Sequence, residues 1–148
     1  MKPGKDTRRD AMRIMLDDFA IEPERAHATD AGLDLKATQD FEIRPGDYHI
    51  EDTGVHVELP PQTVGMIKSK SGLNVRRDII TEGVIDEGYT GSIIVKMYNL
   101  GNEVQKFRKG DKITQLVILP VVVPRTIEIV REFTETERGN RGFGSSGR

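Results

Sequence analysis

The chain is a succession of short apolar runs, and turn-forming residues separate these runs along most of its length. After Pro23 the turn signals fall at Asp30-Ala31-Gly32, Pro45-Gly46-Asp47, Pro60-Pro61, Ser71-Gly72, Glu87-Gly88, Gly101-Asn102 and Lys109-Gly110-Asp111. Intervals of roughly 10 to 15 residues, with apolar alternation at Val55, Val57 and Leu59, favour an all-β sandwich or barrel over βαβ units. The sequence therefore predicts an all-β fold made of short strands.

The domain organisation follows from length and local composition. A chain of 148 residues suits one domain with a real core. We expect residues 1–10 to be a disordered N-terminal extension, residues 11–137 a single β domain, and residues 138–148 a flexible Gly/Ser-rich segment. The pattern from Ala11 to Phe19 fits a short helix and a strand equally. The apolar run from Lys112 to Pro124 predicts burial inside a sheet or between subunits.

Composition excludes several classes of function. A formal net charge of −2, with 31% charged residues, describes no polyanion binder, so we expect no nucleic-acid partner. The chain has no cysteine, which removes disulfides and thiolate metal sites and suits a reducing interior. It also has no run of about 18 apolar residues and no apolar signal segment, so we expect a cytoplasmic protein with no membrane partner.

The stretch from Thr81 to Ser92 predicts a β-hairpin. Glu87-Gly88 can form its bend, and apolar, strand-like residues lie on both sides. Asp86 would then hold a carboxylate near the bend, and Tyr89 would add a flat ring suited to packing on a sugar or a base. An isolated acid in a turn usually serves only the turn itself, so this stretch does not establish a site on its own.

Two polar stretches carry groups that can bind phosphate. Lys68 to Leu73 supplies ammonium groups, hydroxyls and backbone N–H groups, but it lacks the Walker spacing of a P-loop and can equally be a surface turn. Arg138 to Arg148 supplies glycines, serines, and the charges of Arg138 and Arg141. Phe143 has no core to join there, so it is either a stacking residue or part of a disordered terminus.

Further candidate residues are polar side chains in apolar surroundings. Asp34 and Gln115 each interrupt an apolar strand pattern, where a carboxylate is costly unless it has a partner. The three histidines, by contrast, show no metal-ligand spacing with one another, and we expect each to be a surface or locally hydrogen-bonded residue.

Five stretches, in chain order, resemble the five motifs of the trimeric deoxyuridine triphosphatases (dUTPases). They are A-G-L-D-L (Ala31 to Leu35), K-S-G-L (Lys70 to Leu73), G-V-I-D-E-G-Y (Gly83 to Tyr89), G-D-K-I-T-Q-L (Gly110 to Leu116) and R-G-N-R-G-F-G-S-S-G (Arg138 to Gly147). Each stretch is short, but five in this order are a specific signal, and the resemblance covers nearly the whole chain.

The resemblance implies a fold, an assembly and a reaction. The fold would be a jelly-roll-like β domain that forms a homotrimer, with three active sites built between subunits. The reaction would convert dUTP and water to dUMP and pyrophosphate with Mg²⁺ as cofactor.

The resemblance also implies roles for individual residues. Asp86 matches the acid that orients and deprotonates the attacking water, and Tyr89 matches the ring that packs against deoxyribose. Asp34 matches a carboxylate that reaches the metal through water. The hairpin backbone that reads uracil corresponds to Gly83, Val84 and Ile85, and the phosphate contacts correspond to Lys70, Ser71, Gly72 and Gln115.

The C-terminal segment matches a closing lid in the same family. Arg138 would reach the γ-phosphate and Phe143 would stack on uracil. The remaining lid residues that match the motif are Gly144, Ser145 and Ser146.

The sequence departs from the family pattern at several positions, including Lys70, Gly88 and Arg141. Lys70 stands where Arg is usual, which keeps the charge and loses the bidentate fork. Gly88 replaces a frequent Asp, and Arg141 replaces a usual Gly. Two alternatives stay open: a dCTP deaminase, which shares the fold, and a regulatory protein that senses dUTP.

Overall fold

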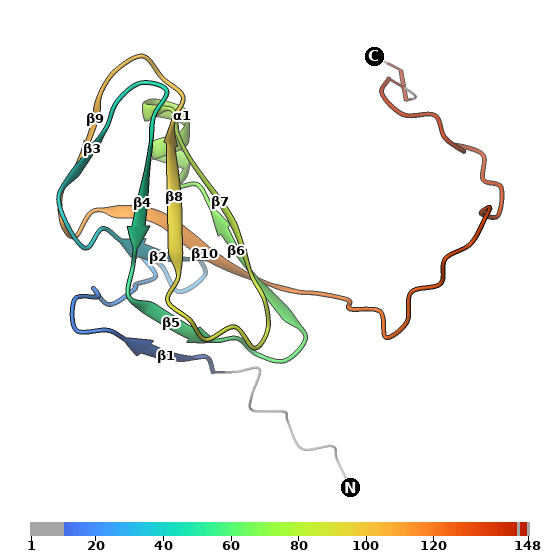
Figure 1. The fold of residues 1–148 in the computed structure, drawn as a ribbon, viewed down its shortest axis with the longest axis horizontal. Helices are drawn as coiled ribbons and strands as arrows, with labels where there is room; N and C mark the ends of the chain where they lie inside the picture. Colours follow the sequence, from blue (N-terminus) through green and yellow to red (C-terminus); the bar gives the residue numbers. More distant parts are fainter. Residues whose placement is uncertain (1–10, 145, 148) are drawn as a thin grey trace, which may run out of the picture.

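The structure is a computed structural model, and it describes residues 11–144 and 146–147 of the chain. The elements of this part, labelled in Figure 1, are β1 (Arg13–Leu16), β2 (Gly32–Lys36), β3 (Phe41–Ile43), β4 (Tyr48–Asp52), β5 (Val55–Glu58), β6 (Thr63–Lys68), α1 (Ser71–Arg77), β7 (Ile79–Ile85), β8 (Ile94–Asn99), β9 (Gln105–Phe107) and β10 (Lys112–Pro120).

The strands form one curled antiparallel sheet with two smaller strand pairs beside it. The six-stranded sheet has the order β2-β10-β6-β7-β8-β4, and the pairs are β1-β5 and β3-β9. All of these pairings are antiparallel. The prediction of an all-β, jelly-roll-like fold of short strands is confirmed, with α1 as an addition.

Alternating burial explains why these segments form strands. In β5, Val55 and Val57 are buried while His56, between them, points away from the core. Side chains on a strand alternate between its two faces, so a period of two fixes which residues face inward. The largest fully buried apolar side chains come mostly from several different strands and include Leu35, Ile43, Ile67, Ile79, Ile93, Met97, Ile113 and Leu116.

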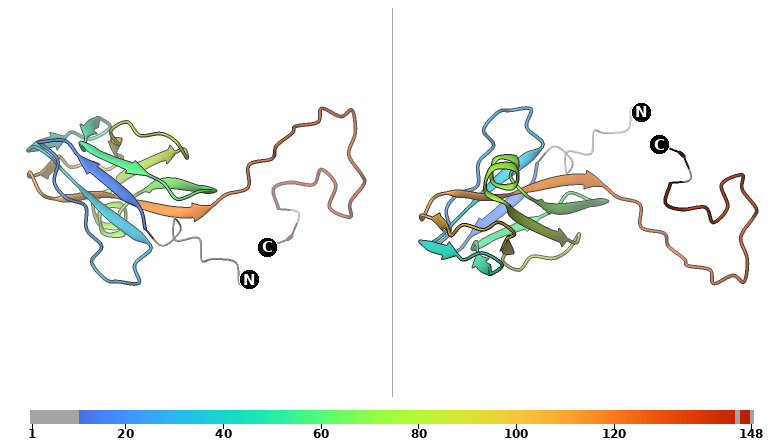
Figure 2. Two further views of the ribbon diagram at one scale, coloured as in Figure 1. Left: turned by 90° about the horizontal axis from the view of Figure 1, so that it is seen from below. Right: turned by 90° about the horizontal axis from the view of Figure 1, so that it is seen from above.

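Strand β10 lies inside the sheet, one strand from its β2 edge, and it pairs with β2 on one side and with β6 on the other. The burial predicted for residues 112–124 is found within this strand, where Ile113, Thr114 and Leu116 are buried. Beyond Pro120 the prediction finds no support within one chain, since Val122 is 88% exposed. Figure 2 shows the chain leaving the end of β10 and running away from the body.

The structure differs from the predicted pattern, or chooses between its alternatives, at two short segments. The segment after Ala11, which fitted a helix or a strand, is the strand β1 paired with β5. The turn predicted at Ser71-Gly72 was wrong, because these residues begin the helix α1. A helix of seven residues is too short to show a helical repeat of apolar residues, and Leu73 is its one residue packed against the core.

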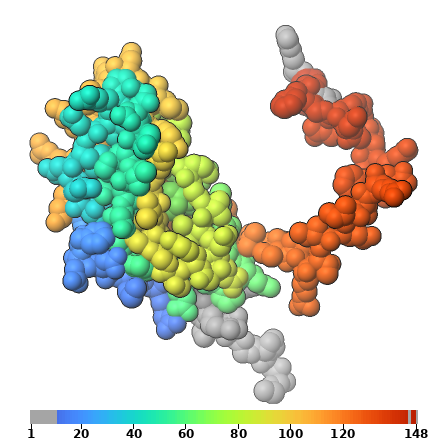
Figure 3. Space-filling view, viewed as in Figure 1, coloured from blue at the N-terminus to red at the C-terminus, as the bar shows by residue number. Residues whose placement is uncertain are grey.

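The chain after β10 has two parts. We call residues 121–137 the arm and residues 138–148 the lid. The described residues of both are exposed, and they stand away from the body in the space-filling view (Figure 3). The boundary at residue 138 stays a prediction, and the predicted extension at residues 1–10 lies outside the described part of the chain.

Candidate active site

A pocket opens where strands β7 and β8 separate. The two strands pair only from Ile79 to Thr81, and β7 then continues alone along β6, with Ile85 opposite Gly65. The two strands are antiparallel and the bend lies at Glu87-Gly88, as predicted. The residues next to the bend, however, are not paired with each other, because the strands diverge. The resulting pocket of about 250 Å³, which we call the loop pocket, is lined by Val84, Ile85, Asp86, Tyr89, Ser92 and Ile94.

A tight turn places Asp86 at the rim of this pocket. The N–H of Tyr89 donates to the carbonyl oxygen of Asp86 at 3.1 Å, which closes a four-residue turn. Gly88 has φ +89° in this turn, a conformation that favours glycine. The Asp86 side chain is exposed, and it also borders a second hollow of about 520 Å³ beside the start of β6 and the arm.

Tyr89 folds back over the loop and forms one wall of the loop pocket. Its hydroxyl donates to the carbonyl oxygen of Ser92 at 3.0 Å, while the ring remains about half exposed. A Cβ at Gly91 would collide with the phenol of Tyr89, so this ring position requires glycine. Gly91 and Ser92 were not among the predicted site residues, and the glycine two positions after Tyr89 is the only local signal for them.

A second group of candidate site residues lies around Asp34 on β2. The carboxylate is 3% exposed, and it accepts a hydrogen bond from Lys70 Nζ at 2.5 Å. Lys112 Nζ lies 3.4 Å from its other oxygen and 3.0 Å from Glu24. Hydrogen bonding to Glu24, and then to Asp34, raises the pKa of Lys112. We call Asp34, Lys70 and Lys112 the lysine–carboxylate cluster, and it supplies the partners that a buried Asp34 requires.

Gln115 joins the lysine–carboxylate cluster to the end of β6. It lies opposite Asp34 in the β2–β10 register, and its Nε2 donates to the carbonyl oxygen of Ser69 at 2.9 Å. Its side chain crosses Gly32, where a Cβ would collide with it. Ser71 and Gly72 follow directly and are exposed at the start of α1. Asp34, Lys70, Ser71, Gly72 and Gln115 are thus brought to one end of the sheet.

The loop pocket lies at the opposite end of the same strands. Lys68 pairs with Glu82 in the β6–β7 register, and Lys70 extends further in the direction away from Asp86. At about 3.3 Å per residue, four residues of β7 place Asp86 roughly 13 Å beyond this pair. Figure 1 shows α1 and the β7–β8 loop at opposite ends of the sheet. One chain therefore does not bring its Asp86 to its own phosphate-binding candidates.

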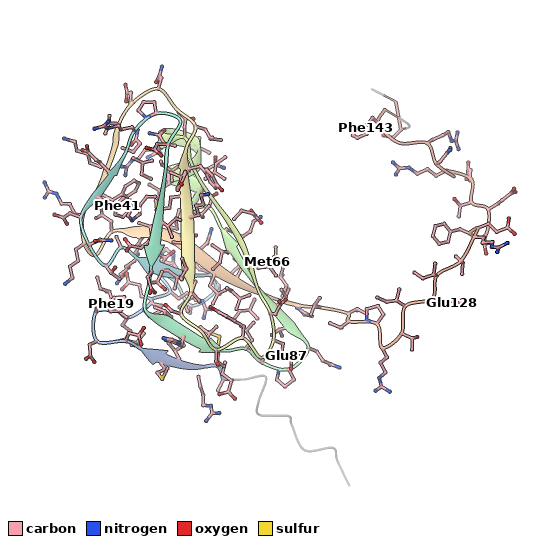
Figure 4. The ribbon with its side chains drawn as sticks, in the orientation of Figure 1. Phe19, Phe41, Met66, Glu87, Glu128 and Phe143 are labelled. Carbon is pink, nitrogen blue, oxygen red and sulfur yellow. The ribbon has the colours of Figure 1, made fainter. Side chains whose placement is uncertain are left out.

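The lid is also separate from both groups. Figure 4 shows Phe143 far along the extended chain, away from Glu87 at the bend and from Met66 on β6. Phe143 is fully exposed, and Arg138 Nε donates to the carbonyl oxygen of Arg141 at 3.0 Å. Gly144 and Ser146 lie in the same exposed stretch, and Ser145 is outside the described residues.

The donor set for a metal is small. In residues 11–144 and 146–147, no group of three or more His, Asp or Glu side chains could hold a metal ion. Asp34 offers one carboxylate, and two lysines already share it. Mg²⁺ keeps several waters and is usually bound by one or two carboxylates together with substrate phosphates. Asp34 fits such a water-mediated contact and does not fit a resident protein-only site.

A family model for dUTPases matches residues 18–147. The chain belongs to the dUTPase family. Among curated relatives, the deoxyuridine 5′-triphosphate nucleotidohydrolase of Gloeothece citriformis is 43% identical over 135 residues, which cover 89% of this chain and 92% of the relative. That of Clostridium kluyveri is 44% identical over 131 residues, which cover 86% of this chain and 91% of the relative.

Solved structures support the same family. The dUTPase of Staphylococcus bacteriophage 80alpha with dUPNHPP superposes with a TM-score of 0.87 at 29% identity, covering 94% of this chain and 99% of the phage chain. A mutant dUTPase of phage phi11 of S. aureus, described with a structural Mg(II) ion, gives a TM-score of 0.76 at 26% identity, covering 83% and 98%. The helix α1 of this dUTPase-family chain is too short and polar to cross a membrane, and the described residues contain no other helix.

Proposed function

We propose that this chain is a dUTP nucleotidohydrolase, which converts dUTP and water to dUMP and pyrophosphate. The observation that carries the proposal is the loop pocket, where Asp86 and Tyr89 border a cavity opened by the divergence of β7 and β8. Membership in the dUTPase family, and relatives named for this reaction, support it.

The loop pocket would bind the nucleoside. Beyond Thr81 the edge of β7 that faces the pocket is not paired with β8, so backbone groups of Gly83 to Ile85 can pair with the polar edge of uracil. The Tyr89 ring would pack on deoxyribose and leave no room for a 2′-hydroxyl. The same backbone edge would exclude a 5-methyl group, so sugar and base are selected by different parts of the pocket.

Asp86 would act as the general base. An exposed carboxylate at the rim of the pocket can hold a water in line with a phosphorus atom and accept its proton. The water oxygen forms a bond to phosphorus, the bond from that phosphorus to the bridging oxygen breaks, and pyrophosphate leaves. One proton of the water passes to the Asp86 carboxylate, the other hydrogen stays on the new phosphate hydroxyl, and no group changes its oxidation state.

The lysine–carboxylate cluster would bind the triphosphate. Lys70 supplies positive charge, while Ser71, Gly72 and Gln115 supply hydroxyl, N–H and amide groups beside it. A bound Mg²⁺ would offset phosphate charge, and Asp34 would contact it through a coordinated water. In the structure Lys70 holds Asp34, so substrate phosphate would compete with Asp34 for that ammonium group.

A homotrimer would complete the site. Because Asp86 and Lys70 of one chain lie at opposite ends of the sheet, the complementary groups have to come from different copies. The arm supports an assembly, since it exposes apolar side chains that a monomer would not leave in water. These side chains include Val122 at 88%, Ile127 at 85%, Ile129 at 90% and Phe133 at 90% exposure.

The lid would close over the bound nucleotide. Its Gly/Ser-rich residues make local hydrogen bonds, and ordering them costs conformational entropy. Stacking of Phe143 on uracil, with Arg138 on the γ-phosphate, would offset that cost. Closure would exclude water other than the nucleophile.

Incubation with single nucleotides tests the proposed function. The purified chain with Mg²⁺ should release pyrophosphate from dUTP and should leave dCTP, dTTP and UTP nearly untouched. Ammonia from dCTP would show a dCTP deaminase instead. Binding of dUTP without turnover would show a protein that senses the nucleotide, and either result would overturn the proposal.

A further inference from the structure

The loop between β7 and β8 is held to the body by its C-terminal half. The N–H of Ile93 donates to the carbonyl oxygen of Val55 at 2.8 Å, and the N–H of Thr53 donates to that of Ile93 at 3.1 Å. The Ser92 hydroxyl donates to a carboxylate oxygen of Asp52. These contacts fix the base of the loop, but Tyr89 and Asp86 lie nearer its tip.

One further contact reaches closer to Tyr89. His56 extends from β5 on the face away from the core, and its Nδ1 lies 2.7 Å from the carbonyl oxygen of Thr90. Its Nε2 lies 3.0 Å from a carboxylate oxygen of Asp17, and the side chain is only 17% exposed. Asp17 is itself anchored, because its N–H donates to the carbonyl oxygen of Gly54 at 2.9 Å. The imidazole therefore bridges two fixed acceptors.

Both partners of this imidazole can only accept hydrogen bonds. A backbone carbonyl carries no proton, and an ionised carboxylate carries none either. A neutral imidazole has a single N–H, so it can satisfy only one of the two, while an imidazolium ion donates to both. The complete bridge between Asp17 and Thr90 therefore requires the protonated form of His56.

The charged surroundings favour that form. Hydrogen bonding to the Thr90 carbonyl, followed by that to Asp17, raises the pKa of His56, and the charge of Asp52 acts in the same direction. The nearest ion pair along β5 is Arg13 with Glu58, two residues away and exposed. Because the pKa is raised on folding, the stabilisation is complete below the ordinary value near ~6.5 and is lost as pH rises through the folded value.

We propose that His56 is a positioning residue for the loop pocket, and that its protonated ring holds the Thr90 carbonyl so that Tyr89 and Asp86 keep their places. This role rests on the proposed dUTP hydrolysis. Loss of the proton releases one of the two bonds, so the loop becomes looser and must be ordered when substrate binds. Protonation of His56 therefore tunes affinity for the nucleoside more than the chemical step.

Kinetics against pH test this role. His56→Gln should raise KM for dUTP about fivefold at pH 6, within the range for the loss of one ordinary hydrogen bond, with kcat changed less than twofold. The ratio of the KM of His56→Gln to the KM of the parent chain should fall toward one as pH rises, because His56 of the parent chain then loses its proton. Asp17→Asn should keep the ring and move this transition to lower pH.

His27→Gln is the matched control. His27 also lies 3.0 Å from a carboxylate, that of Asp30, but its side chain is 80% exposed and its partner is three residues away in the same loop. This variant should leave KM and its pH profile unchanged. An equal change in His27→Gln and His56→Gln would overturn the positioning role.

Nuclear magnetic resonance separates this inference from the proposed function. The chain has three histidines and three tyrosines, so ring signals of His56 and Tyr89 can be assigned with His56→Gln and Tyr89→Phe. The Tyr89 signals should shift with pH, and the midpoint of this shift should equal that of the His56 titration, whether or not dUTP is hydrolysed. Tyr89 signals that do not change as His56 titrates would overturn the inference. The same holds for a pH profile of KM that is identical in the parent chain and His56→Gln.

Discussion

The loop pocket and the lysine–carboxylate cluster occupy opposite ends of the same strands and are built by different means. The loop pocket depends on backbone geometry: a turn with Gly88 at positive φ, a ring folded over Gly91, and strands that diverge after Thr81. The lysine–carboxylate cluster depends on charge, with a nearly buried Asp34 held by two lysines. Under the proposed function, the shape of the loop pocket would select the nucleoside, and the charge of the lysine–carboxylate cluster would bind the triphosphate.

The loop pocket and the lysine–carboxylate cluster should also respond differently to a ligand. A shaped pocket holds its form without ligand, because hydrogen bonds within the chain fix it. A charged cluster keeps its internal ion pairs until a stronger anion displaces them, as a triphosphate with Mg²⁺ would. Substitutions in the two regions should therefore change different properties of the protein, and by different amounts.

The largest effect should come from Asp86→Asn. The amide keeps the shape of the side chain but cannot accept a proton from water, so turnover should fall about a thousandfold while dUTP affinity changes less than threefold. Glu87→Gln is the neighbouring control, since the Glu87 carboxylate accepts a hydrogen bond from the Gln62 N–H at 2.9 Å, which a glutamine amide oxygen can also accept. Near-normal turnover by Asp86→Asn would exclude Asp86 as the base.

Removal of residues 138–148 should be nearly as damaging to activity and almost harmless to folding. The described lid residues pack against no core, so the melting temperature and the proposed trimer should persist while dUTP turnover falls at least a hundredfold, an estimate based on lost closure. Mixed trimers of truncated and Asp86→Asn chains should regain activity, because one site can take its acid and its lid from different copies. No rescue after verified mixing would mean that each lid serves its own chain's loop.

The stretches that form these two regions are identifiable from the sequence, because the candidate site residues belong to local motifs in a fixed order. Asp34 and Lys70 lie 36 residues apart, yet each was singled out by its own stretch. The all-β fold was also predictable, since period-two alternation reports which face of a strand is buried.

Other features depend on contacts that such patterns do not encode. Alternation does not say where two strands stop pairing, so the divergence after Thr81 was not predicted. Gly91 is required by a side chain that folds back on it, and His56 acts through Thr90, 34 residues away. His49, expected at the surface or in local hydrogen bonds, instead stacks on Phe41 with ring centroids 3.7 Å apart.

A smaller effect is expected from Asp34→Asn, which tests the charged end directly. The variant removes the charge that Lys70 and Lys112 share, and both lysines are partly exposed and can be rehydrated. We expect a loss of about 2 kcal/mol in the free energy of unfolding, within the range for hydrogen bonds to charged groups. Urea denaturation measures it, and an unchanged midpoint would mean that the cluster contributes only to phosphate binding.

Gly91→Ala tests the shaped end and should act mainly on substrate binding. The added methyl group would push the Tyr89 ring from its place over the loop, so KM for dUTP should rise about fivefold, as for a modest overpacking strain. Discrimination against UTP should weaken in the same variant, because the displaced ring no longer covers C2′. Unchanged KM values for both nucleotides would show that the ring position is not what selects the sugar.

The smallest effect should come from Glu82→Gln, which provides the contrast for Asp34→Asn. Glu82 pairs with Lys68 at 2.9 Å, between the 2.5 and 3.4 Å of the two lysine contacts of Asp34, but its side chain is 57% exposed and that of Lys68 is 47% exposed. Exposed ion pairs are screened by water and salt and contribute about 0–1 kcal/mol, so the unfolding midpoint should move by less than half of the shift in Asp34→Asn. Measurements in low and high salt sharpen the comparison, because the small contribution of the Lys68–Glu82 pair should vanish in salt while that of Asp34 should largely persist. Equal destabilisation by the two variants would mean that burial does not set the strength of these pairs, and the distinction between the charged end and an ordinary polar surface would fail.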